Sequence, residues 1–225
     1  MTIVEDLAPT GTLRASINLG NPVLAQGTAE EPRGVTVDIA REIARRLEVP
    51  VEFLCFDAAR KSFEAMATGA ADLCFLAIDP ARATEVAFTE PYVVIEGVFA
   101  VPRDSPLHAL DEIDQPGVRV GVKHGSAYDL HLSRSLQRAE IVRGAEGVDV
   151  FRSESLEVAA GIRQPLTAYV EEHDDLRLID EPFMQIRQAV GTTVSRQPAT
   201  VAFLREVVDE LVESGFIAAS LETSA

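Results

Sequence analysis

Two short segments carry groups suited to bind a small carboxylate. Arg82 follows Asp79-Pro80-Ala81, and its planar guanidinium can meet a carboxylate through two parallel N–H groups while remaining charged at any relevant pH. Gly125, Ser126 and Ala127 stand between an apolar run and an amphipathic stretch, where backbone N–H groups and the positive end of a helix dipole are available. Each segment also has an ordinary explanation, Arg82 as an exposed residue after a proline turn and Ser126 as a helix N-cap.

Four further polar residues stand at the ends of apolar runs or within them. Asn18 closes the first run, Lys61 lies in the turn after the second, and Lys123 ends the run that precedes Gly125. Glu96 lies inside the long apolar segment 92–101, which also contains Tyr92. All four are candidates to line a binding site, and each is explained as well by a solvated or strand-ending side chain.

Short apolar runs alternate with amphipathic stretches along the chain, which is typical of an α/β fold. The pattern predicts strands and helices in alternation. The expected strands are 13–18, 51–56, 72–78, 118–122, 140–142, 157–160 and 176–179. The expected helices are 36–47, 62–68, 126–138, 164–172 and one that begins near Pro198 and ends at Gly215.

Two extended segments are long or isolated enough to cross between two lobes. One is Tyr92–Val101, with Gly97 near its centre, and the other is Gln188–Thr193. Two crossings make the first lobe discontinuous. We therefore predict a first lobe of residues 1–96 with 192–225 and a second lobe of residues 97–191, with the ligand held in a cleft between them.

The charge balance excludes several classes of partner. The 36 acidic residues against 20 basic residues give a formal net charge of −16, and no run of lysine or arginine interrupts it. Such a surface repels nucleic acid and anionic lipid. A small anionic ligand therefore needs a local positive site.

Cys55 and Cys74 each lie in an apolar run, so we expect buried free thiols rather than a disulfide. The four histidines lack metal-ligand spacing, and the sequence calls for no cofactor or metal. The first residues contain no signal peptide, and no segment reaches the roughly 20 apolar residues of a membrane span. We expect a periplasmic protein if a leader has been removed, and a cytoplasmic one as the sequence stands.

Several motifs in this order resemble the type II periplasmic solute-binding proteins, in the branch that serves amino-acid ABC transporters. They are Gly34-Val35-Thr36-Val37-Asp38, Ala71-Asp72-Leu73, Asp79-Pro80-Ala81-Arg82, Phe88-Thr89-Glu90-Pro91-Tyr92 and the segment 117–126. The resemblance spans nearly the whole chain. It implies two α/β lobes joined by two crossing strands, which close by a hinge over a small solute.

The resemblance also assigns roles to residues. It implies that Arg82 holds the carboxylate of an amino acid or a related solute, and that Asn18 and Lys123 face the ligand. Ala77 stands where relatives often place a hydroxyl group. The implied partner is an ABC transporter permease, and we expect a monomer with no catalytic residue.

One departure from the family pattern concerns the ligand's amino group. Relatives place an aspartate that pairs with the ligand's ammonium where this chain has Ile162. An unpaired buried ammonium is expensive. Either another carboxylate, Glu96, Asp79 or Glu157, replaces the aspartate, or the ligand has no α-ammonium.

Two other functions stay open. A few relatives of this fold are dehydratases, and such an enzyme needs a carboxyl group as general acid, for which Glu96 or Glu157 are candidates. A sensory or regulatory binding protein that works inside the cell shares the fold and the ligand chemistry and differs only in its partner. No nucleophile elbow is present, and the cluster Ser126, Asp129 and His131 is not by itself a triad.

Overall fold

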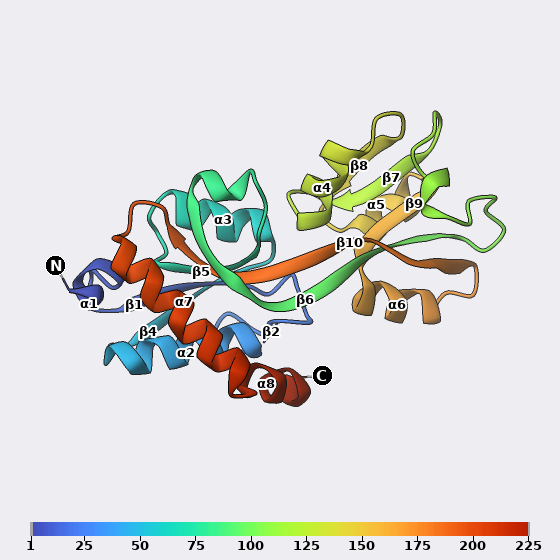
Figure 1. The fold of residues 1–225 in the computed structure, drawn as a ribbon. Helices are drawn as coiled ribbons and strands as arrows, with labels where there is room; N and C mark the ends of the chain where they lie inside the picture. Colours follow the sequence, from blue (N-terminus) through green and yellow to red (C-terminus); the bar gives the residue numbers. More distant parts are fainter. Residues whose placement is uncertain (1, 225) are drawn as a thin grey trace. The chain divides into compact units, whose positions relative to one another are not determined.

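The computed structural model describes residues 2–224 and divides them into two compact units. Unit 1 comprises the chain up to Val93 and from Arg187 onward, and unit 2 comprises Val94–Ile186. Each unit is an α/β structure built around its own group of strands, as Figure 1 shows. The expected α/β class is therefore confirmed.

The described part of unit 1 contains five strands that lie wholly within it, and the helices that pack on its sheet. The strands of its sheet are β1 (Leu13–Asn18), β4 (Val51–Phe56) and β5 (Leu73–Ala77), and a separate short hairpin is formed by β2 (Gln26–Gly27) and β3 (Pro32–Arg33). The helices are α1 (Ile3–Leu7), α2 (Val35–Leu47), α3 (Ala59–Ala67), the 3-10 turn η1 (Arg82–Thr84), α7 (Pro198–Glu213) and α8 (Phe216–Ser224).

The parallel strands of unit 1 bring the loops that follow them to one edge of the sheet. β1 pairs in parallel with β4 and with β5, and β5 pairs antiparallel with the last part of β10 (Leu176–Thr193). The carboxyl ends of β1, β4 and β5 therefore share one edge. In open α/β sheets this edge is where ligands bind.

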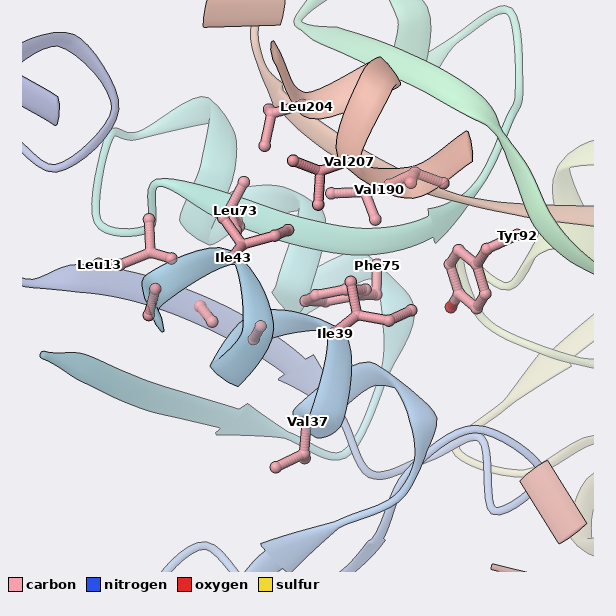
Figure 2. Packing of buried hydrophobic residues seen from close by; sticks show 14 of the residues in the cluster. Leu13, Val37, Ile39, Ile43, Leu73, Phe75, Tyr92, Val190, Leu204 and Val207 are labelled. Carbon is pink, nitrogen blue, oxygen red and sulfur yellow. The ribbon is translucent and has the colours of Figure 1, made fainter. Parts of the chain in front are cut away.

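The core of unit 1 is buried on both faces of β5. Leu73 and Phe75 belong to the cluster formed with α2 and α7, whereas Cys74 and Leu76 belong to the cluster formed with α3. Figure 2 shows Leu73 and Phe75 beside Ile39 and Ile43 of α2, with Val190 close by. Because both faces are covered, β5 is apolar at every position rather than at alternate ones.

Unit 2 repeats the same organisation. Its strands β7 (Arg119–Lys123), β8 (Glu140–Gly144) and β9 (Val158–Ile162) are parallel, with β7 in the middle, and β9 also pairs antiparallel with β6 (Val86–Pro102). Its helices are the 3-10 turn η2 (Leu110–Glu112), α4 (Ala127–Ser135), α5 (Gly147–Ser153) and α6 (Arg163–Glu171). The carboxyl ends of β7, β8 and β9 share one edge.

Two long strands, β6 and β10, belong to both units. The sequence predicts an extended segment at Tyr92–Val101, and the structure extends it to 17 residues. It also joins the two strands expected at 176–179 and 188–193 into one strand of 18 residues. Gly97 in β6 has no room for a side chain, since a Cβ atom there would lie 2.9 Å from Phe183 and from Met184.

Most of the other expected elements are present within a few residues of the predicted bounds, and the sequence missed the shortest helices. The helix expected at 126–138 ends at Ser135. Three helices were not expected, α1, α5 and α8. The first two have five and seven residues, too short for an apolar stripe to show a period.

Both cysteines are free thiols, as expected, but only Cys74 is buried. Burial raises the pKa of the Cys74 thiol to about 12. Cys55 is only partly buried, so the expectation of two buried thiols is wrong for this residue. Its strand β4 is the edge strand of unit 1 and has no fully buried residue.

Candidate binding site

Arg82 is a buried cation at the carboxyl edge of the unit 1 sheet. It begins the turn η1 shortly after β5 ends, and only 3% of the residue is exposed. Its Nη1 group donates to the carbonyl of Ala77 at 3.2 Å, and its backbone N–H donates to the carbonyl of Asp79 at 3.0 Å. The alternative of an exposed arginine after a proline turn is therefore wrong.

Asp79 shapes the turn that carries Arg82. Its Oδ1 atom accepts a hydrogen bond from the N–H of Ala81 at 2.8 Å, and the residue is itself buried. Burial lowers the pKa of the Arg82 guanidinium, while the nearby Asp79 carboxylate acts in the opposite direction. A guanidinium remains charged through such a change, so Arg82 is a permanent cation held by backbone contacts near the Asp79 carboxylate.

The other candidates of unit 1 also follow the carboxyl ends of parallel strands, and each has a local partner. Asn18 ends β1, and its Oδ1 atom accepts from the N–H of Gly20 at 3.1 Å. Lys61 lies in the first turn of α3, after β4, and pairs with Asp57 at 2.8 Å. Ala77 is the last residue of β5 and supplies the carbonyl that Arg82 contacts.

Two buried polar atoms of unit 1 were missed by the sequence reasoning. The Oδ1 atom of Asn21 and the hydroxyl of Tyr92 have no hydrogen-bond partner within residues 2–224, although both residues are about 95% buried or more. Figure 2 shows the Tyr92 ring beside Phe75, and the two rings meet edge to face at 6.3 Å. Asn21 follows the first strand in the segment Gly20-Asn21-Pro22. Its place after a strand is the sequence feature that could have indicated it as a candidate.

In unit 2, Gly125 and Ser126 form the turn from β7 into α4. Gly125 has φ +69°, a left-handed conformation that favours glycine, and Ser126 is the N-cap of the helix. The Ser126 Oγ atom accepts from the N–H of Asp129 at 3.0 Å, so the N-cap explanation of Ser126 is confirmed. The N–H of Gly125 donates to Asp129 Oδ2 at 2.8 Å, and the N–H of Ser126 donates to the Lys123 carbonyl at 3.1 Å.

These internal bonds narrow what the turn can offer a ligand. Two of its three N–H groups already have acceptors, and the N–H of Ala127 has none among the contacts of residues 2–224. Ala127 is the first residue of α4, where an N–H normally lacks an intrahelical partner. The Ser126 hydroxyl is also engaged, since it hydrogen-bonds the Tyr128 side chain. The N–H of Ala127 is therefore the donor of this turn that remains.

Lys123 and Glu96 are both engaged in ion pairs within unit 2. Lys123 ends β7, is buried, and pairs with Glu146, the N-cap residue of α5. The alternative of a solvated strand-end lysine is therefore wrong. Glu96 of β6 pairs with Arg163 at 2.5 Å.

The Glu96–Arg163 pair lines a cavity that belongs to unit 2 alone. The cavity has a volume of about 310 Å³, and its other lining residues are Val94, Ile95, Gln164 and Gln185. Arg163 is the first residue of α6 and directly follows Ile162, the last residue of β9. From sequence, only Ile162 was noted here, as the residue in place of the family's aspartate, and Arg163 was not proposed as a site residue.

Glu157 lies at the opposite edge of the unit 2 sheet. It precedes β9, and its carboxylate binds the Nε and Nη2 atoms of Arg119, which begins β7, at 3.0 and 2.8 Å. Because β7 and β9 are parallel, both residues stand at the amino ends of their strands. The Arg119 guanidinium holds the pKa of Glu157 below its usual value. Glu157 is therefore no candidate for a site at the carboxyl edge.

Among residues 2–224, no group of three or more His, Cys, Asp and Glu side chains is arranged to hold a metal ion. No helix in this part of the chain is long and apolar enough to cross a membrane. The candidate binding residues are Arg82 at the sheet edge of unit 1 and, separately, Lys123 and Ser126 at the sheet edge of unit 2.

Solved structures with the same fold cover nearly the whole chain. A mutant of ArgBP from T. maritima aligns with a TM-score of 0.80 at 20% identity, over 99% of this chain and 98% of that one. An L-arginine-bound amino acid ABC transporter substrate-binding protein from Streptococcus pneumoniae aligns with a TM-score of 0.80 at 16% identity, over 100% and 98%. The ancestral amino acid-binding protein AncCDT-1, a precursor of cyclohexadienyl dehydratase, aligns with a TM-score of 0.79 at 19% identity, over 99% of both chains.

No curated protein sequence matches this chain significantly. The family comparison is decisive instead, since residues 17–223 match the bacterial extracellular solute-binding proteins, family 3. The match covers both units and the strands that cross between them. The chain therefore belongs to family 3 of the bacterial extracellular solute-binding proteins.

Proposed function

We propose that this chain binds a small carboxylate-bearing solute, an amino acid or an analogue of one, as the substrate-binding component of an ABC transporter. Arg82 is the observation that carries the proposal. It is a buried cation at the carboxyl edge of a parallel sheet, where α/β folds bind ligands. A buried guanidinium at such an edge is well suited to a carboxylate, because its planar N–H groups match the two oxygens.

The bound ligands of the structural neighbours support the solute class. One is a Wolinella succinogenes binding component of an ABC transporter complexed with lysine, at 16% identity and a TM-score of 0.76 over 95% of this chain and 94% of that one. Others are bound to L-arginine. Hinge closure of two lobes is the mechanism we propose, with Arg82 of unit 1 and the Ser126–Ala127 turn of unit 2 as the ligand contacts.

A dehydratase activity is the less favoured alternative. An enzyme of that kind needs a carboxyl group that holds a proton near neutral pH. Glu157 is held as a carboxylate by Arg119, which lowers its pKa, and Glu96 is paired with Arg163. The Arg119 contact favours the charged carboxylate of Glu157, which is the wrong form for a general acid.

The experiment that tests the proposal is titration of the whole chain and an Arg82 variant with a panel of small acids. We expect Arg82→Ala to weaken binding of the best solute by about 2–5 kcal/mol, as loss of one partner of a buried charge pair does. Arg82→Lys keeps the positive charge but lacks the planar guanidinium, so its affinity for the solute should lie between those of the unmodified chain and Arg82→Ala. Arg41→Ala is the matched control, since Arg41 lies on the outer face of α2 and its side chain is 55% exposed.

The melting temperature of each unliganded variant separates lost binding from lost folding. A solute at a hundred times its dissociation constant stabilises the native state by about 2.7 kcal/mol, which a thermal shift detects easily. Unchanged affinity in a folded Arg82→Ala variant contradicts the proposal. A solute that is chemically converted during the titration identifies the chain as an enzyme.

A further inference from the structure

The turn that carries Arg82 also contains a buried carboxylate. Asp79 is 4% exposed and Arg82 is 3% exposed, and both lie in unit 1, shortly after the carboxyl end of β5. A buried cation and a buried anion three positions apart in one tight turn attract each other, because burial leaves little water to screen the charges. The attraction is evident at the Arg82 guanidinium, whose pKa burial lowers and the Asp79 carboxylate raises.

Asp79 is the anion that offsets the charge of Arg82. Among residues 2–224, the titratable groups that act on the Arg82 guanidinium are Asp79 and Cys74. Burial raises the pKa of the Cys74 thiol to about 12, so this thiol is uncharged at neutral pH. The carbonyl of Ala77, which accepts from Arg82 Nη1 at 3.2 Å, contributes a dipole and no full charge. The negative charge that faces Arg82 in this part of the chain is therefore that of Asp79.

The turn itself fixes the position of Asp79. The Asp79 Oδ1 atom accepts from the N–H of Ala81 at 2.8 Å, and the Asp79 carbonyl accepts from the N–H groups of Arg82 and Ala83 at 3.0 and 2.9 Å. Pro80 follows directly and restricts the backbone on both sides of the bond that joins it to Asp79. The carboxylate therefore stays beside Arg82 whether or not a solute is bound.

A fixed anion beside a carboxylate-binding arginine has two opposite effects. Without solute, the anion stabilises the fold, since a buried guanidinium that lacks a counter-charge is strongly destabilising. With solute, the anion opposes binding, since it repels an approaching carboxylate and has already neutralised part of the charge of Arg82. The same side chain therefore raises the stability of the empty protein and lowers its affinity for an acid.

We propose that Asp79 is a resident counter-ion of Arg82, which stabilises the empty site and limits the affinity for the solute's carboxylate. The inference rests on the proposed function and deepens it by naming a residue that sets the affinity. Asp79 acts through Arg82 and is a positioning residue. This role removes Asp79 from the carboxylates that could replace the aspartate absent at Ile162.

The variant Asp79→Asn separates this role from a purely structural one. Asparagine keeps an oxygen that can accept from the Ala81 N–H, so the turn is retained while the negative charge is removed. The probes are L-arginine, L-lysine, L-glutamate and glutarate, titrated into the whole chain by calorimetry. We expect Asp79→Asn to bind the best of these acids about tenfold more tightly than the unmodified chain does. Loss of a merely structural contact would weaken binding or leave it unchanged, and either result overturns the inference.

Two controls show whether the gain depends on charge at this position. Glu85→Gln makes the same change of charge at the exposed C-cap residue of the same turn, and we expect it to alter the affinity less than about twofold, because solvent and salt screen this carboxylate. The α-carboxamides of the three amino acids lack the carboxylate, so Asp79→Asn should not tighten their binding. An equal gain in Glu85→Gln, or an equal gain for the carboxamides, contradicts the counter-ion role.

An ammonium-binding role for Asp79 predicts the opposite sign. If Asp79 accepted the ammonium group of the solute, Asp79→Asn would weaken binding of L-glutamate and spare glutarate, which has no amino group. That result refutes the counter-ion role and leaves the carboxylate-binding function in place. If none of the four acids shifts the melting temperature of the unmodified chain or of Asp79→Asn, the function and the inference fail together.

The melting temperatures of the unliganded proteins test the counter-ion without any solute. Asp79→Asn and Arg82→Gln should each melt below the unmodified chain, and the double variant should lose less than the sum of the two decreases, because it contains no unpaired charge. This comparison also serves if Asp79→Asn is too unstable for titration. Additive decreases show that the two side chains do not interact and overturn the inference. The proposed function is tested apart from this by the loss of binding in Arg82→Ala.

Discussion

Asp129 accepts a hydrogen bond from the backbone N–H of Gly125 at 2.8 Å, across the first turn of α4. The same buried carboxylate accepts hydrogen bonds from Arg143 of β8 and from Ser133. The backbone N–H of Asp129 donates to the Ser126 Oγ atom. One side chain thus fixes the turn that carries the remaining backbone donor, the N–H of Ala127. Asp129 is a positioning residue for the candidate site.

Replacing Asp129 by alanine should therefore loosen this turn. Asp129→Ala leaves the Arg143 guanidinium and the Gly125 N–H without their acceptor, and we expect a loss of about 3 kcal/mol in the free energy of unfolding. Faster hydrogen exchange at the Gly125 amide is the direct measurement. Ser133→Ala is the control, because it removes the contacts of Ser133 with Asp129 and Arg143 but leaves the bond from Asp129 to the Gly125 N–H. Equal exchange rates in the two variants would contradict this role.

A second buried carboxylate ties the ends of the unit 1 chain together. Asp72 is fully buried, and it accepts from the Arg14 backbone and side chain and from Arg196 at 2.9 Å. Asp72→Asn leaves two arginines facing a neutral amide, so we expect a loss of about 3–5 kcal/mol in unfolding free energy. Urea denaturation measures it. Arg14→Gln should cost less, because Arg196 still neutralises the carboxylate, and the reverse order would refute this account.

The two cysteines should differ in reactivity toward a thiol reagent. Cys74 is fully buried with a thiol pKa of about 12, whereas Cys55 is partly accessible with a pKa raised by burial and by Glu30. In the native protein at pH 8 we expect slow labelling of one thiol and, after unfolding, rapid labelling of two. Cys55→Ala should abolish native labelling. Labelling of the folded Cys55→Ala variant at the wild-type rate would show that Cys74 is accessible.

The burial of Cys74 also predicts a loss of stability at high pH. Its folded pKa of about 12 lies above the ordinary value of 9.0, so its contribution is complete below pH 9 and declines as the pH rises toward 12. Cys74→Ala should flatten this part of the unfolding free energy curve. Unfolding curves measured from pH 8 to 11 on both proteins give the comparison, and parallel curves would contradict the assignment.

Acid should weaken α2 through Glu42. Arg45 and Arg46 hold the pKa of Glu42 at about 2, below its ordinary value of 4.5. A depressed folded pKa gives stability that is present above pH 4.5 and is lost as the pH falls toward 2. Because the pairs lie near the surface, we expect Glu42→Gln to cost about 1 kcal/mol at neutral pH and to lose this effect at pH 2. A cost that stays constant with pH would count against the ion pairs.

The sequence by itself determined the α/β class and most of the elements, because the apolar period of a strand or helix is a local property. Strand β1 and helix α2 were predicted within one residue, since each has a clear apolar pattern and a boundary residue such as Gly34 or Pro50. Arg82 was singled out from sequence by the resemblance of Asp79-Pro80-Ala81-Arg82 to a family motif and by the chemistry of its guanidinium, and Ser126 because it opens a helix shortly after a strand. Family membership followed from the order of such local motifs.

Only the tertiary structure decided which partners these residues have. The ion pairs of Lys123 with Glu146 and of Glu96 with Arg163 join residues that are 23 and 67 positions apart. No local pattern encodes such a pairing, since it depends on strand register and on which loops share a sheet edge. The parallel pairing of β7 and β9 removed Glu157 from the candidate site, because parallel strands place all their amino ends at one edge. The antiparallel pairing of β6 and β9, which sets Gly97 opposite Ile162, brought Arg163 beside Glu96.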